Sequence, residues 1–306
     1  MRSGVTAPIV LFAYNRPRHL AQTLESLRRN VLAEQSDLYV FSDAARTPAA
    51  TESVRQVRDY LRTTGGFRSV VIEERPTNLG LAKSVIDGVT RVCSEHGRVI
   101  VLEDDMVTSP YFLKFMNEGL DLYENQQEVV SLHGYLYPVR SPLPESFFLK
   151  NTGCWGWATW DRGWRQFQPD GRILLDELRQ RNLTRAFDFD GTYPFTGMLE
   201  AQIRGENDSW AIRWQASAFL RGMLTLYPGR SLVRNIGHDG SGAHCGRTKA
   251  FDVEPTDAPI DLQRVSLEES AVAAAAFRNY FRTQSQPGLA RRVAHKLRAA
   301  WRAAVA

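Results

Sequence analysis

The first 125 residues alternate short apolar runs with helical patterns, and this alternation constrains the fold more than any other feature. The expected strands cover Pro8–Tyr14, Leu38–Ser42, Ser69–Glu73 and Arg98–Leu102, and the expected helices cover Arg18–Asn30, Thr51–Arg62 and Leu81–Cys93. Strands that alternate with helices at this spacing form βαβ units and a parallel sheet. The chain is therefore predicted to be an α/β protein with a mostly parallel sheet and flanking helices.

The fourth expected strand ends in three consecutive carboxylates, Glu103, Asp104 and Asp105. Ligands of parallel sheets bind at the carboxyl ends of the strands. Neighbouring carboxylates repel one another unless a cation compensates, and oxygen ligands select Mg²⁺ or Mn²⁺. Taken alone, the three acids are more typical of a solvated loop before the helix expected near Ser109-Pro110. Further polar motifs follow the other strands and would share this edge: Tyr14-Asn15-Arg16, Asp43 and Asn78-Leu79-Gly80.

After residue 130 the expected elements become shorter and more irregular. The expected strands cover Ser131–Tyr137, Ser146–Lys150, Gly153–Trp160, Leu224–Tyr227 and Leu232–Asn235, and the expected helices cover Leu174–Arg181, Ser209–Arg221 and Leu267–Phe281. We expect residues 1–130 and 131–283 to be two halves of one compact unit, followed by a distinct segment, 284–306.

The composition is typical of a globular protein and disfavours the zinc-binding, secreted, membrane-spanning and nucleic-acid-binding classes. The chain has 306 residues and is 43% hydrophobic and 24% charged, which is typical of a globular protein. Its cysteines, Cys93, Cys154 and Cys245, include no CxxC pair, which favours a reducing cytosol and disfavours a zinc site. Neither a signal peptide nor a transmembrane helix is expected. The net charge of +4 is spread over the chain, so no nucleic-acid partner is expected.

The chain lacks the GxxxxGK[ST] loop and lacks GxGxxG after its first strand, so a nucleotide would have to be held in another way. Over about residues 7–240 its strand-end motifs together resemble the nucleotide-sugar half of GT-A glycosyltransferases. The likeness is to bacterial family-2-like enzymes and, through Val-Leu-Glu-Asp-Asp-Met, to the N-acetylglucosaminyltransferase I type. It implies a nucleotide-sugar-binding half, 1–130, and an acceptor and catalytic half, 131–283.

The resemblance also implies roles for individual residues. Phe12, Tyr14, Asn15 and Asp43 would hold the nucleoside, Asn78, Gly80 and Lys83 would lie near the ribose and diphosphate, Asp104 would lie near the ribose or donor sugar, and Asp105 would bind Mn²⁺ or Mg²⁺. Lys83-Ser84 departs from the arginine-rich pattern usual after Asn-x-Gly. Each residue also has a structural interpretation, such as a turn aspartate for Asp43 or a helix N-cap for Asn78.

The segment Cys154–Trp160 is rich in tryptophan and glycine. Flat aromatic faces stack on sugar rings, and glycine lets a ring approach the backbone closely. The resemblance favours donor- or acceptor-facing roles for Trp155 and Gly156, and Trp157 is a further candidate for contact with a sugar. Core packing explains each tryptophan equally well.

An inverting transferase needs a carboxylate that takes the proton from the acceptor hydroxyl. The run Glu206-Asn207-Asp208-Ser209-Trp210 supplies two candidates and resembles the motif in which these families place their base. We expect Asp208 to be the catalytic base, with Glu206 as the second candidate. The competing interpretation makes Asp208 a helix N-cap, and a cap would be a poor base.

Two histidines, His238 and His244, lie in the glycine-rich segment Gly237–Gly246. By resemblance, either could be a metal or phosphate ligand contributed from the C-terminal side.

The last 18 residues predict a basic amphipathic helix. Its apolar side would carry Leu289, Val293, Leu297, Trp301 and Val305, and its basic side Arg291, Arg292, His295, Lys296, Arg298 and Arg302. Such a helix suits an anionic membrane surface. Packing on the protein, or a disordered tail, is the alternative.

These expectations combine into one function. It is metal-dependent, inverting transfer of a sugar from a nucleoside-diphosphate sugar, with a UDP-sugar favoured, to a glycan or lipid-linked acceptor. The setting would be bacterial surface polysaccharide or lipopolysaccharide synthesis at the inner face of the cytoplasmic membrane. Two alternatives stay open: a nucleotidyltransferase that makes sugar nucleotides, and a non-catalytic glycan-binding protein.

Overall fold

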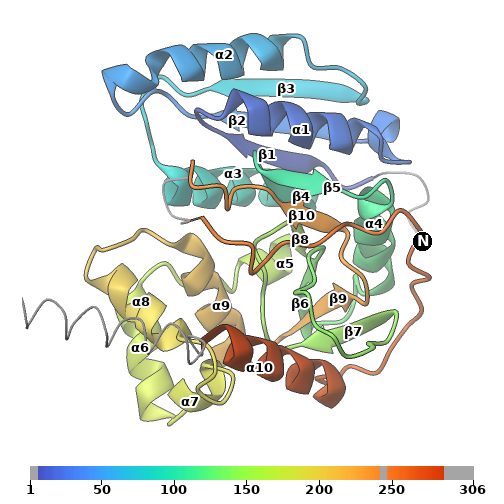
Figure 1. The fold of residues 1–306 in the computed structure, drawn as a ribbon, viewed down its shortest axis with the longest axis vertical. Coiled ribbons are helices and arrows are strands. Elements are labelled where there is room, and N and C mark those ends of the chain that lie inside the picture. The colour runs from blue at the N-terminus through green and yellow to red at the C-terminus, as the bar shows by residue number, and fades with distance from the viewer. Residues whose placement is uncertain (1–5, 242–246, 286–306) are drawn as a thin grey trace, which may run out of the picture.

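The computed structural model describes residues 6–241 and 247–285. Its centre is an eight-stranded sheet in the order β3-β2-β1-β4-β8-β6-β9-β7 (Figure 1). The strands are β1 (Ile9–Ala13), β2 (Asp37–Ser42), β3 (Ser69–Glu74), β4 (Arg98–Glu103), β6 (Val129–His133), β7 (Ser146–Leu149), β8 (Trp157–Trp160) and β9 (Leu224–Pro228). Strands β1 to β4 are mutually parallel, β6 and β9 share their direction, and β8 and β7 run against it. The predicted α/β class with a mostly parallel sheet is confirmed.

Helices cover both faces of the first four strands. The helices α1 (Pro17–Arg28), α2 (Thr51–Arg62) and α4 (Phe112–Leu122) pack in one apolar cluster, and α3 (Leu81–His96) and α9 (Trp210–Leu220) pack in another. Alternate residues of β1 enter the two clusters: Ile9 and Leu11 face the first, and Val10 and Phe12 face the second. A strand buried on both faces is continuously apolar, which explains the sequence of β1.

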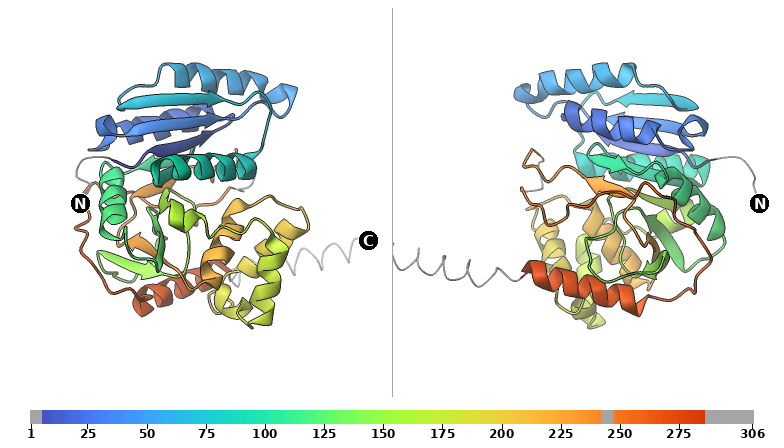
Figure 2. Two further views of the ribbon diagram at one scale, coloured as in Figure 1. Left: turned by 180° about the vertical axis from the view of Figure 1, so that it is seen from behind. Right: turned by 45° about the vertical axis from the view of Figure 1, so that its right-hand side comes forward.

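A third apolar cluster lies beyond the sheet's other end, where Phe147 of β7 and Tyr227 of β9 pack against helices. Those helices are α6 (Gly171–Gln180), α7 (Thr184–Phe187), α8 (Phe195–Ile203) and α10 (Ala271–Ser285), while α5 (Asp161–Trp164) follows β8 directly. Figure 2 shows α6, α7 and α8 grouped together, with α10 alongside them. Of these helices, α8 contributes Phe195 and Met198 to the wall of the candidate site.

A small second sheet ties the two halves of the chain together. Strand β5 (Met106–Thr108), directly after the acids, pairs antiparallel with β10 (Val233–Asn235), and Asn235 lies opposite Met106. The chain after β10 is thereby brought to Asp105, whose carbonyl oxygen accepts a hydrogen bond from the Ile236 amide at 2.9 Å.

Several boundaries differ from those predicted. The strand expected over Gly153–Trp160 begins only at Trp157, because Gly156 has a left-handed backbone with φ +67° that interrupts an extended chain. The strand expected over Ser131–Tyr137 ends at His133, and the last described helix begins at Ala271 rather than Leu267. Helix α8 was not predicted. None of the described helices combines the length and apolarity needed to cross a membrane.

Candidate functional site

One arginine pairs with two of the three acids at the end of β4. The Arg16 guanidinium forms ion pairs with Asp104 and, at 2.8 Å, with Asp105. Asp104 also accepts a hydrogen bond from the Tyr14 amide at 3.3 Å. Both aspartates are more than nine-tenths buried. The protein thus supplies an internal cation where repulsion between carboxylates would otherwise be largest.

Burial raises the pKa values of Glu103 and Asp104. Burial, with the charges of Asp105 and Asp104, raises the pKa of Glu103 to about 8, while Arg16 and a hydrogen bond from Trp210 act in the opposite direction. Burial also raises the pKa of Asp104 against the lowering effect of Arg16. Although burial alone would lower the pKa of Arg16, the two aspartates raise it above its ordinary value. Burial therefore favours the neutral form of the Glu103 carboxyl group.

Two polar side chains at this edge have buried atoms without a hydrogen-bond partner among the described residues. They are Asp105, through Oδ1, and His238, through both ring nitrogens. His238 lies near enough that the Asp105 charge acts on its pKa, which burial lowers overall. A neutral imidazole nitrogen and a carboxylate oxygen are suitable ligands for Mn²⁺, and Mg²⁺ commonly takes one or two carboxylates plus substrate phosphates.

The described residues contain no group of three or more His, Cys, Asp or Glu that could hold a metal ion. Among the described residues, the candidates to hold a metal here are Asp105 and His238, and further ligands would have to come from outside this pair, such as diphosphate oxygens and water. This arrangement fits a divalent ion that arrives with a nucleotide. His244 falls outside the described residues, as does the segment 286–306.

Gly237 allows the loop that carries His238 to approach Asp105 closely. A Cβ atom at position 237 would lie 2.0 Å from Asp105 Oδ2 and 3.0 Å from an Arg16 nitrogen.

Gly237→Ala should therefore displace Asp105 or the loop and weaken Mn²⁺ binding in the presence of UDP by about 10–100-fold. An electron paramagnetic resonance titration with Mn²⁺ measures this. Gly197→Ala is the matched control, since its Cβ would meet no atom within 4 Å. Equal affinities for the two variants would contradict the metal site.

Asp43 organises the loop before α3. Its carboxylate accepts hydrogen bonds from the Ala44, Leu79 and Gly80 amides, each at 2.9 Å, and from the Asn78 side chain at 3.0 Å. Four such bonds occupy the usual capacity of a carboxylate. A direct contact between Asp43 and a nucleoside would displace one of them, so its observed role is to shape the loop.

That loop leaves the first turn of α3 without a side-chain cap. Gly80, the N-cap residue, has φ +76°, and Leu81 lines the candidate cavity described below. Uncapped amides at the start of a 16-residue helix are suited to bind phosphate. Lys83, one turn into α3, is paired instead with Asp87 at 2.9 Å and is mostly exposed.

The structure corrects the expectation for Phe12. This side chain is 3% exposed, stacks on Phe41 and packs against Gly88 of α3. It cannot reach a nucleobase, because the alternation along β1 turns it into the core. Tyr14 and Asn15 are partly exposed, and the Tyr14 hydroxyl accepts a hydrogen bond from the Arg46 amide at 2.9 Å.

A cavity of about 630 Å³ extends from Glu103 and Leu81 towards α8 and α9. Aromatic side chains dominate its walls: Tyr137, Trp155, Tyr193, Phe195, Trp210 and Phe251. Trp155 is partly exposed and packs edge-on against His238, with ring centroids 5.2 Å apart. The metal-site candidate His238 and the aromatic walls therefore belong to one cavity.

Trp157 does not belong to this cavity. It is 1% exposed and stacks on Trp210, with further ring contacts to Trp164 and Trp214. The expected sugar contact of Trp157 is therefore wrong, and its core interpretation is correct. Gly156 packs closely against Val233 and Phe112, so its close approach serves the core as well.

The two candidate bases differ sharply. Asp208 lines the cavity with a side chain that is 69% exposed, whereas Glu206 is exposed, forms an ion pair with Arg204 at 2.6 Å, and is not among the lining residues. The helix-cap interpretation of Asp208 is wrong, because the Ser209 hydroxyl caps α9 by accepting from the Ile212 amide. Asp208 therefore keeps its carboxylate available to a ligand.

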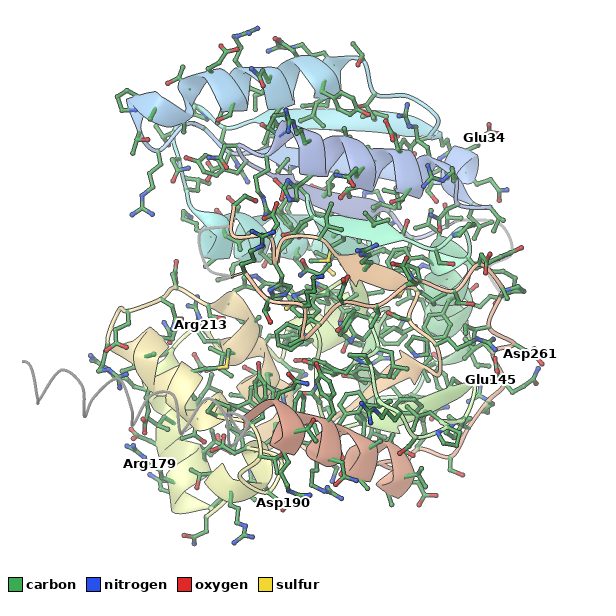
Figure 3. The ribbon with its side chains drawn as sticks, viewed as in Figure 1. Glu34, Glu145, Arg179, Asp190, Arg213 and Asp261 are labelled. Carbon is green, nitrogen blue, oxygen red and sulfur yellow. The ribbon has the colours of Figure 1, made fainter. Side chains whose placement is uncertain are left out.

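Arg213 fixes the segment that carries Asp208. This arginine on α9, labelled in Figure 3, is 8% exposed and donates to the carbonyl oxygens of Ser209 and Pro169 and to the Asp208 carboxylate, each at 3.1 Å. Burial lowers the pKa of Arg213, while Asp208 opposes that effect. Arg213 was not singled out from the sequence, and Arg16 was placed at this edge without being given a role.

Several solved structures match the chain at low sequence identity. S. aureus TarS is 15% identical, and the match covers 46% of this chain but only 24% of TarS, with a TM-score of 0.31. The mannosyltransferase PcManGT from Pyrobaculum calidifontis, in complex with GDP-Man and Mn²⁺, is 13% identical, with 71% of this chain and 74% of that chain covered and a TM-score of 0.39.

A third match is glucosyl-3-phosphoglycerate synthase from Mycobacterium tuberculosis, in complex with Mn²⁺, UDP and glucosyl-3-phosphoglycerate. It is 12% identical, with 60% of this chain and 68% of that chain covered and a TM-score of 0.37. No protein-family description and no curated protein sequence matches the chain. Because these TM-scores lie below 0.5, the case for an activity rests on the site residues alone.

Proposed function

We propose that this protein is a metal-dependent GT-A glycosyltransferase that moves a sugar from a nucleoside-diphosphate sugar to a hydroxyl group, with inversion. One observation carries the proposal. Asp105 and His238 each have buried atoms without a hydrogen-bond partner among residues 6–241 and 247–285, and the β5–β10 pair brings them together beside a cavity whose lining includes Asp208. A metal site, a phosphate-binding helix start and an accessible base in one cavity are the parts that such a transfer requires.

The proposed reaction is a single displacement. Asp208 takes the proton from the acceptor hydroxyl, whose oxygen forms a bond to the anomeric carbon as the bond to the diphosphate oxygen breaks. The electron pair leaves with the diphosphate. A bound divalent ion would neutralise charge on that leaving group. The amides at the start of α3 supply further positive potential at this edge, and the Arg16 guanidinium offsets part of the negative charge of Asp104 and Asp105.

Calorimetry with UDP, with and without Mn²⁺, tests the proposal against its alternatives. We expect UDP binding that depends on Mn²⁺, together with slow donor hydrolysis and no pyrophosphorolysis. Formation of sugar nucleotide from sugar phosphate and nucleoside triphosphate would instead identify a nucleotidyltransferase. Glycan binding without any nucleotide binding would identify a glycan-binding protein.

The proposed setting is the assembly of bacterial surface polysaccharide or lipopolysaccharide on an anionic membrane surface. Its support is the basic amphipathic pattern within residues 284–306.

Deleting residues 288–306 should weaken binding to anionic vesicles, and added salt should weaken binding of the intact chain. Mn²⁺-dependent UDP binding should survive the deletion, because every other proposed site residue precedes it. Equal vesicle binding by both chains would reject the membrane role.

A further inference from the structure

The cavity contains a second pair of buried polar atoms without a partner among the described residues. They are Nδ1 of His133 and Oδ1 of Asn151, and both side chains line the cavity and are 3% exposed. Buried polar atoms in folded proteins almost always have a partner, because leaving one unpaired is costly. Two of them in one cavity indicate a place where a ligand completes the hydrogen bonding.

The hydrogen bonds already made by these side chains define what they can still accept or donate. Nε2 of His133 lies 3.3 Å from the Trp155 amide, and it must accept that hydrogen bond. Burial lowers the pKa of His133 to about 3, so the ring is neutral at pH 7 and carries its proton on Nδ1. His133 therefore offers a hydrogen-bond donor.

Asn151 offers a hydrogen-bond acceptor instead of a donor. The Tyr227 hydroxyl donates its hydrogen to the Asn151 backbone carbonyl at 2.9 Å, so its second partner, 2.8 Å away on the Asn151 side chain, must be a donor. This fixes the amide with Nδ2 towards Tyr227. The remaining atom, Oδ1, is a hydrogen-bond acceptor.

Both groups are held rigidly. A Cβ atom at Gly153 would lie 2.1 Å from the His133 ring, and Tyr227 packs edge-on against that ring at 4.9 Å. Gln215, another polar residue of the wall, already accepts from the Thr152 amide and hydroxyl and donates to the Lys150 carbonyl. Apart from His238, the buried side-chain atoms of this cavity that lack a partner among the described residues belong to His133 and Asn151.

We propose that His133 and Asn151 bind the acetamido group of a sugar, an inference that rests on the proposed function. An acetamido group has one N–H for Asn151, one carbonyl oxygen for His133, and a methyl group suited to the aromatic walls. A carboxylate would place negative charge against the Asn151 oxygen, and an ammonium group would face the His133 N–H. The same chemistry can be carried by the transferred sugar or by the acceptor sugar.

The experiment compares sugars with and without this group, using the full chain and Mn²⁺. One arm measures the Kd of UDP-N-acetylglucosamine against UDP-glucose and of UDP-N-acetylgalactosamine against UDP-galactose. The other arm, with UDP present, compares the methyl glycosides of N-acetylglucosamine and glucose. We expect the acetamido compound to bind at least about tenfold more tightly in one arm, and that arm identifies the sugar concerned.

Two substitutions test whether the preference for the acetamido group depends on His133 and Asn151. Asn151→Leu and His133→Phe should each reduce the ratio to below about threefold while leaving Mn²⁺-dependent UDP binding unchanged. Met198→Leu, in the same cavity wall but without a polar atom, should keep the wild-type ratio. Wild-type ratios near one in both arms would overturn the inference even if neither variant folds, and so would a preference that survives both substitutions. If the wild-type protein showed no Mn²⁺-dependent UDP binding, that result would instead overturn the proposed function itself.

Discussion

Asp105→Ala is expected to lower metal-dependent sugar transfer by roughly 10³-fold or more, because the carboxylate that would hold the metal is removed from a buried edge. The loss should appear as weak Mn²⁺ binding in the presence of UDP and as slow release of nucleotide from the donor. Arg16 would then pair with Asp104 alone. Steady-state assays over a Mn²⁺ series separate loss of affinity from loss of turnover.

The matched control is Asp59→Ala, which removes an exposed acid on α2 that pairs only with neighbouring arginines. Its kcat, KM and Mn²⁺ dependence should stay at wild-type values. Turnover of Asp105→Ala within a few-fold of this control would exclude a metal-binding role for Asp105.

Asp208→Asn should reduce kcat by about 10²–10⁴-fold while leaving Mn²⁺-dependent UDP binding intact, since the amide keeps the shape of the side chain but cannot take a proton. The Arg213 contact to Oδ1 can be preserved in the variant, so the segment should remain in place. Single-turnover transfer, measured beside UDP calorimetry, distinguishes this effect from loss of folding.

Glu206→Gln provides the comparison for the base. Glu206 is exposed and pairs with Arg204, which lowers the pKa of Glu206 through a side-chain hydrogen bond. We expect its substitution to change kcat by less than about twofold, as for other exposed ion pairs. If Glu206→Gln proved the more damaging change, the assignment of the base would be reversed.

The sequence was most informative about elements whose pattern is local. Helix α2 has the predicted bounds, and β4 ends one residue beyond the prediction, at Glu103. Buried parallel strands and amphipathic helices leave periodic signals within ten residues of sequence, so they can be recognised without tertiary information. The prediction that the strand ends lie along one edge of the sheet followed from the same alternation of strands and helices.

Side-chain direction was harder to predict. Phe12 and Trp157 were candidates for ligand contact, yet both are core residues, because in a strand covered on both faces every side chain is buried and composition does not distinguish the faces. Asp43 was assigned to the nucleoside, whereas its four hydrogen bonds shape the next loop. These roles depend on contacts between segments far apart in the chain.

The pairing of β5 with β10 also has a consequence for folding. Met106 and Asn235 are brought opposite one another only after a loop of more than a hundred residues has closed, which carries an entropic cost and slows formation of such contacts. The acids belong to an early, local part of the chain, but His238 reaches them only through this late contact. Nucleotide-dependent Mn²⁺ affinity should therefore recover with the slowest phase of refolding, after the helices of the first half have regained their circular dichroism signal.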